Sequence, residues 1–210
     1  MNYRRLVQHP AKWVILAEML TRGVGLLTLP VFTTIMSPAD FGNFVYLVTL
    51  TSVIAVTTSL GLYGSINYYW HENEPKQSLL ISAAFLNMFL VVSLTIILFS
   101  TPVMSPGLPD KTMLYFCLLS ALSQNQAQLM TTQLFINHQY RNISYLVLIR
   151  FSLSLLAPLL LMLISDNSTF QFRFILFVIC DTLVVAAFWL KEIYWKNSKF
   201  QLSTALNMLK

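Results

Sequence analysis

Four charged side chains lie inside long apolar stretches of the sequence, where a charge is costly unless it meets a partner or water. They are two acids and two bases: Glu18, Arg22, Arg150 and Asp181. Glu18 precedes Arg22 by four residues, so the two share one helical face in the favourable order. Such charges either pair to fix helix packing or line a cavity, in which an arginine can bind an anion such as phosphate. Both interpretations stay open.

A second polar feature is a cluster of amides in the apolar stretch around residue 125. Four carboxamides occupy positions 124, 125, 126 and 128. On a helix, Gln124 and Gln128 share a face with Ser120 and Thr131, and Asn125 adjoins that face. Amides are unfavourable in lipid unless they contact protein or water. We favour a hydrophilic wall for a hydroxyl-rich ligand over interhelical hydrogen bonds alone, because packing seldom needs so many amides.

The sequence contains no motif typical of nucleotide binding, nucleophilic catalysis or metal binding. It has no phosphate-binding glycine loop, no nucleophile elbow and no metal-ligand spacing of His and Cys. Both cysteines, Cys117 and Cys180, lie in apolar runs, which disfavours a disulfide framework or a metal site. We therefore expect no enzyme activity, no metal and no cofactor. A membrane-embedded glycan polymerase, which can look equally bare, is kept as an alternative.

The overall composition indicates what kind of element carries these side chains. Of 210 residues, 56% are hydrophobic and only 10% are charged, and the mean hydropathy is +0.66. Soluble domains carry roughly 25% charged residues. A soluble enzyme, a disordered regulator and a nucleic-acid binder are therefore disfavoured, and the net charge of +5 suits the cytoplasmic loops of a polytopic membrane protein.

Six apolar stretches are long enough to cross a bilayer, which takes roughly 20 residues per helix. They cover residues 13–36, 41–63, 78–99, 112–136, 143–164 and 171–190. These runs are continuous rather than alternating, which excludes membrane β-strands. We predict an all-α, six-helix transmembrane bundle over residues 1–190. Residues 191–210 are predicted to form a cytoplasmic amphipathic connector.

The distribution of Lys and Arg sets the predicted orientation. With the N-terminus inside, nine of them lie on the cytoplasmic side, against only Lys111 and Arg173 outside. Both termini are then cytoplasmic. The four intramembrane charges fall ~8–14 Å below the cytoplasmic surface at the helical rise, so they share one layer. This depth suggests the pairs Glu18–Arg22 and Arg150–Asp181.

Two further features concern helix shape and the membrane interface. Pro30 and Pro158 stand inside predicted helices, where each removes a backbone hydrogen bond and introduces a kink. The aromatic residues Tyr63, Tyr68, Tyr69 and Trp70 lie at the cytoplasmic end of the second span. We interpret them as an interfacial belt.

Three motifs resemble those of a known family. The stretch from Arg22 contains Gly23 and Pro30, a Thr-rich helix end, and then the run Pro38-Ala39-Asp40-Phe41-Gly42. Leu-Gly-Leu around Gly61 and the short basic loop at residues 136–141 follow at similar spacing. Together they resemble the polysaccharide-biosynthesis (oligosaccharide, O-antigen) flippase family. In physical terms, Pro38 begins the turn, Asp40 is expected to cap the next helix, and Gly42 is expected to allow close packing behind Phe41.

The resemblance implies a fold and a function. Members belong to an exporter superfamily that includes multidrug exporters, and they have two six-helix halves around a central, often cationic cavity. The implied substrate is an undecaprenyl-diphosphate-linked oligosaccharide, such as an O-antigen unit of lipopolysaccharide, moved across the bacterial inner membrane. On that likeness Arg22 and Arg150 would steer the diphosphate, and the amides Gln124, Asn125 and Gln128 would contact sugar hydroxyls. The implied partners are the lipid bilayer and this substrate, and not nucleic acid.

The length departs from that family, whose members usually have twelve or more helices. We favour an N-terminal fragment, because residues 191–210 resemble the connector that leads into a seventh helix. The alternative is a half-transporter that pairs with a second half-chain or with its own copy. Other functions kept open are a multidrug-exporter-like transporter that uses Asp181 for ion coupling, a glycan polymerase, and a structural membrane subunit.

Overall fold

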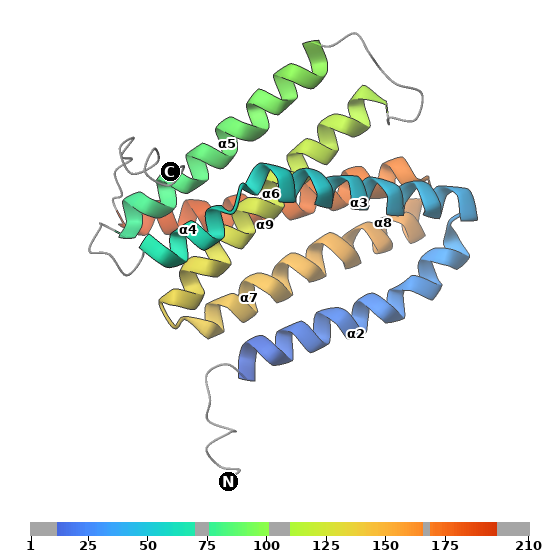
Figure 1. Ribbon diagram of the computed structural model, residues 1–210. Coiled ribbons are helices and arrows are strands. Elements are labelled where there is room, and N and C mark those ends of the chain that lie inside the picture. The colour runs from blue at the N-terminus through green and yellow to red at the C-terminus, as the bar shows by residue number, and fades with distance from the viewer. Residues whose placement is uncertain (1–11, 70–75, 101–109, 166–168, 197–210) are drawn as a thin grey trace.

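The computed structural model describes residues 12–69, 76–100, 110–165 and 169–196. Within these ranges the chain is helical apart from short connections, and no strand occurs, as predicted. The helices pack side by side into a bundle (Figure 1). Their bounds are α2 (Lys12–Ile35), α3 (Pro38–Ser59), α4 (Leu62–Tyr69), α5 (Lys76–Ser100), α6 (Lys111–Ile136), α7 (Tyr140–Phe151), the π-helical turn η1 (Ser152–Leu156), α8 (Ala157–Ser165) and α9 (Phe170–Lys196).

Among the described residues, four helical segments are both long and apolar enough to cross a membrane: Pro38–Ser59, Leu79–Ser100, Tyr140–Leu161 and Phe170–Lys191. Helix α6 is also long, at 26 residues, but its amides make it more polar than these four. The described parts of the six stretches predicted from the sequence are helical, except that the second is interrupted at Leu60 and Gly61. The number of crossings and the orientation of the termini stay predictions, and residues 197–210 of the predicted connector lie outside the described residues.

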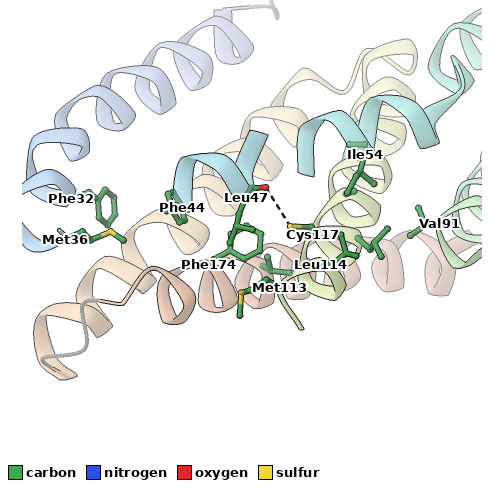
Figure 2. Packing of buried hydrophobic residues seen from close by; sticks show 14 residues of the cluster. Phe32, Met36, Phe44, Leu47, Ile54, Val91, Met113, Leu114, Cys117 and Phe174 are labelled. Carbon is green, nitrogen blue, oxygen red and sulfur yellow. Dashed lines mark hydrogen bonds between the residues drawn. The ribbon is translucent and has the colours of Figure 1, made fainter. Parts of the chain in front are cut away.

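Helix α6 forms the centre of the bundle. It packs against α3, α5 and α9, and near its C-terminal end also against α4 and α7. Small side chains on its inner faces, among them Cys117, Ser120 and Ala121, are fully buried and let neighbouring backbones approach closely. Figure 2 shows this packing, with the Cys117 thiol pointing at the Leu47 carbonyl oxygen 3.8 Å away.

The start of α3 differs from its prediction. Ser37, not Asp40, is the N-cap residue, because its Oγ accepts a hydrogen bond of 3.1 Å from the Asp40 N–H. Asp40 lies in the first turn, where its carboxylate suits the helix dipole and accepts from the Ser37 hydroxyl at 2.8 Å. The expected close packing at Gly42 is also wrong, since a Cβ built there would meet nothing within 4 Å. Pro38, expected to begin the turn before a helix starting at residue 41, is instead the first residue of α3.

The predicted second helix, residues 41–63, is broken in two. Leu60 and Gly61 have positive φ angles of 44° and 71°, so α3 ends at Ser59 and α4 begins at Leu62. Glycine adopts this left-handed conformation without a steric penalty. The Thr58 carbonyl in the last turn of α3 accepts a hydrogen bond of 3.0 Å from the Asn87 side chain of α5. The side chain of Asn87 thus satisfies an acceptor at the helix end.

The helices differ at the two prolines that were predicted to introduce kinks. Helix α2 continues without interruption through Pro30. The helix from Tyr140 to Ser165 instead widens into the π-helical turn η1, immediately before Pro158. A proline ring crowds the carbonyl four residues earlier and offers it no N–H, and a wider turn relieves that crowding.

The left-handed turn at Gly61 generates a stability prediction. Gly61→Ala should destabilise the purified protein by about 1–2 kcal/mol, because a Cβ disfavours positive φ. The matched control Gly64→Ala lies in α4 with open space around it, and it should stabilise by about 0.5–1 kcal/mol. Thermal unfolding in detergent measures both changes. Equal changes in stability for the two substitutions would contradict the left-handed turn at Gly61.

Candidate functional site

Arg150 of α7 and Asp181 of α9 form a two-pronged ion pair. The Arg150 Nη2 donates to Asp181 Oδ2 at 3.0 Å, and its Nε donates to Oδ1. The Ser123 hydroxyl of α6 also donates to Oδ2, at 2.7 Å. Charge-assisted bonds of this fork geometry are strong and directional. The pairing suggested by depth is therefore present, and it joins α6, α7 and α9.

The two partners differ in their exposure. The Asp181 side chain is only 2% exposed, whereas the Arg150 side chain is 27% exposed. The carboxylate is thus enclosed by its donors, while part of the Arg150 side chain is accessible. An arginine has five N–H groups, so donors remain for a further acceptor.

The Arg150 side chain lines a cavity of about 330 Å³ between α6, α7 and α9. Its polar lining comes from three helices and the π-helical turn: Gln128, Thr131, Arg150, Ser154 and Asp181. Its apolar lining consists of Ala127, Leu146, Val147, Phe151 and Phe177. This volume lies at the small end of the range for ligand pockets.

The sequence explains why space remains at this point. Ser123, Ala127 and Thr131 follow one another at intervals of four along α6, so they form one stripe of small side chains. Ser154 adds a small side chain from the π-helical turn, and its hydroxyl donates to the Arg150 carbonyl oxygen. Larger residues at these positions would fill the cavity.

The predicted wall of amides divides between two sides of α6. Asn125 is buried: its Nδ2 donates to Thr58 Oγ1 at 2.9 Å, and its Oδ1 accepts from the Tyr63 hydroxyl at 2.6 Å. Gln126 Nε2 donates to the Ala84 carbonyl at 3.1 Å. These bonds tie α6 to α3, α4 and α5, as interhelical packing would. Tyr63 is half-buried and its hydroxyl is bound to α6, so it takes part in packing the bundle, and the interfacial belt stays a prediction.

Gln128 is the one amide of this cluster that lines the cavity. Gln124 is partly buried and does not contribute to the described lining. A rotation of about 100° per residue separates adjacent positions on a helix, so neighbouring amides face different partners. The structure thus brings Gln128, Arg150 and Asp181 together and places Asn125 in a separate network.

The remaining predicted site residues lie in α2. Glu18 and Arg22 belong to this helix, but their side chains lie outside the described residues, so their pairing stays a prediction. Helix α2 packs along α7, which carries Arg150. A Cβ at Gly23 would meet nothing within 4 Å.

Arg173 is a buried charge that the sequence interpretation missed. The distribution of Lys and Arg counts it among the charges outside the membrane, yet it is only 6% exposed within α9. Its guanidinium carbon is 3.0 Å from the ring centroid of Phe32 and 3.8 Å from that of Phe44. Stacking on two aromatic faces gives the charge favourable cation–π contacts. No local sequence signal links residues so far apart in the chain.

Comparison with known proteins adds to this geometry. The family described as polysaccharide biosynthesis protein matches residues 10–209. The chain belongs to this family. No curated protein and no solved structure matches the chain. The family and the apolar helices together indicate a membrane protein of polysaccharide biosynthesis.

The exposure difference within the ion pair generates a second prediction. Arg150→Met should destabilise the protein more than Asp181→Leu, because it leaves the buried Asp181 carboxylate with Ser123 as its only partner. Breaking a buried pair costs about 3–5 kcal/mol, whereas replacing both partners by apolar residues is often neutral. The double variant should therefore unfold at a temperature close to that of the unchanged protein.

Thermal unfolding of the four proteins in detergent completes this double-mutant cycle. Additive losses in the double variant would mean that the two side chains do not interact. A larger loss for Asp181→Leu than for Arg150→Met would contradict the stated difference in burial.

Proposed function

We propose that this protein is a flippase-type exporter that moves a lipid-linked oligosaccharide across the bacterial inner membrane. The cargo would be an O-antigen unit or another surface polysaccharide repeat. The family membership supports a role in polysaccharide biosynthesis, and the apolar helices support a membrane location. The polar cavity at Arg150 is the observation that carries the proposal, since a polar interior among apolar helices suits passage of a polar group.

Arg150 is proposed to contact the phosphate of the substrate. Two of its nitrogen atoms are bound to Asp181, and part of the side chain faces the cavity. The remaining N–H groups of Arg150 would donate to a phosphate while the two bonds to Asp181 are kept. Asp181 also keeps its hydrogen bond from Ser123, so no buried carboxylate is left unpaired. The paired carboxylate offsets the charge of Arg150, which weakens phosphate binding and so permits release.

The sugar hydroxyls are proposed to contact the rest of the polar lining. The Gln128 amide both donates and accepts. The hydroxyls of Thr131 and Ser154 donate to the carbonyls of Ala127 and Arg150, so their oxygen atoms are left to accept from a ligand. Small neutral polar groups suit a substrate that must also leave the site. In this proposal the protein needs no cofactor and catalyses no covalent step.

The stripe on α6 provides a matched pair of variants. Thr131 lines the cavity and adjacent Thr132 does not, yet each hydroxyl donates to the carbonyl four residues earlier at 2.9 Å. Thr131→Val should lower glycan export several-fold, because it replaces a polar oxygen of the lining with a methyl group. Thr132→Val should leave export within about twofold of the unchanged protein.

The measurement is surface polysaccharide in cells where the variant is the sole copy, with protein abundance in the membrane fraction as the control. Gln128→Leu should behave like Thr131→Val. If both cavity variants export normally at normal abundance, the cavity is not the substrate pathway.

A further inference from the structure

A second, larger pocket lies at the end of the bundle where α2 begins and α6 passes into α7. Its volume is about 650 Å³, and it is separate from the cavity at Arg150. Figure 1 shows the first turn of α2 beside the first turn of α7. His138 reverses the chain between α6 and α7 with a positive φ of 57°. The lining consists of Lys12, Trp13 and residues 138–142.

The lining of this pocket is cationic and aromatic. Lys12 and Arg141 contribute two positive charges, and His138 adds an imidazole. No carboxylate occurs among the described residues that line it. Gln139 and Asn142 provide amides that can donate to an anion. The chemistry of this lining suits a phosphate group.

Arg141 is held in place at the edge of the pocket. Its Nε donates to the Tyr145 hydroxyl at 3.0 Å, and its guanidinium carbon lies 5.5 Å from the same ring. Both contacts come from a residue one turn along α7, so the side chain is oriented before a ligand binds. Bidentate binding of phosphate is characteristic of arginine.

An exposed apolar stripe continues from Arg141 along the outside of α7. Tyr145, Ile149 and Leu153 follow at intervals of four, which places them on one helical face, and all three are exposed. On neighbouring α2, Trp13, Leu16 and Leu20 are also exposed. Two adjacent helices thus present hydrocarbon surface directly beside a cationic pocket.

We propose that this pocket binds the phosphate of an anionic membrane phospholipid, whose acyl chains lie along the exposed stripes of α2 and α7. Trp and Tyr beside Lys and Arg are typical of the headgroup layer of a membrane. The predicted orientation places the pocket at the cytoplasmic surface, where basic pockets between helices bind anionic headgroups. The paired stripes favour a diacyl lipid over a free anion. This site is independent of the proposed transport function.

The test uses the full chain purified in neutral detergent and titrated with phosphatidylglycerol or phosphatidylcholine, with bound lipids counted by native mass spectrometry. Arg141→Gln should weaken phosphatidylglycerol binding about fivefold, the effect of one lost positive charge near anionic lipid. Arg141→Lys keeps the charge but loses the two-pronged geometry, so it should bind phosphatidylglycerol more tightly than Arg141→Gln and more weakly than the unchanged protein. The matched control Lys111→Gln removes an exposed positive charge at the opposite end of α6 and should bind normally.

Four results would overturn the proposal. The first is equal binding by the Arg141→Gln and Lys111→Gln variants, and the second is equal binding of phosphatidylglycerol and phosphatidylcholine. The third is displacement of phosphatidylglycerol by millimolar inorganic phosphate, which would indicate a site for free anions. The fourth is displacement by purified lipid-linked oligosaccharide at lower concentrations, which would indicate a substrate site. A failure of glycan export in other variants leaves each of these readouts unchanged.

Discussion

The bundle depends on one constraint, which is that the polar middle of α6 must find partners among apolar helices. An unsatisfied amide or hydroxyl in hydrocarbon costs several kcal/mol. Asn125 bonds to α3 and accepts from α4, Gln126 donates to α5, and Ser123 donates to Asp181 of α9. These bonds arrange the neighbouring helices around α6, so a helix that is more polar than the four membrane-length segments becomes the central one. The break after Ser59 belongs to the same network, because Asn87 satisfies the Thr58 carbonyl there.

The same helix has a second face with a different purpose. Toward α3, α4 and α5 the amides of Asn125 and Gln126 are hydrogen-bonded to other groups of the protein. Toward α7 and α9 its side chains are small, and they leave a cavity beside the Arg150–Asp181 pair. A neutral ion pair at the wall of this cavity holds an arginine partly accessible without leaving a buried charge unpaired. Structural support and a candidate substrate contact are thus provided by the same helix.

Long apolar runs and the depth of charges were sufficient to predict the helices and the Arg150–Asp181 pair. Contacts between distant segments were not predictable. Arg173 was counted among the charges outside the membrane because the rings of Phe32 and Phe44 approach it only in the folded bundle. The partner of each amide depends on the direction in which its position faces on the helix. Asn125, Gln126 and Gln128 are only one to three residues apart, yet they face different neighbours. The capping by Ser37 instead of Asp40 was a local feature, and the Ser-x-x-acid spacing was present in the sequence to indicate it.

The most direct test of the transport account is translocation in reconstituted vesicles. The whole protein, as the cell makes it, is placed in liposomes with a purified lipid-linked oligosaccharide, and a membrane-impermeant glycosidase is added outside. The account predicts that the enzyme first cleaves the fraction of glycan exposed at the outset, about half, and then continues toward completion as the protein moves the remainder outward. Cleavage that stops at the level of protein-free vesicles would contradict it.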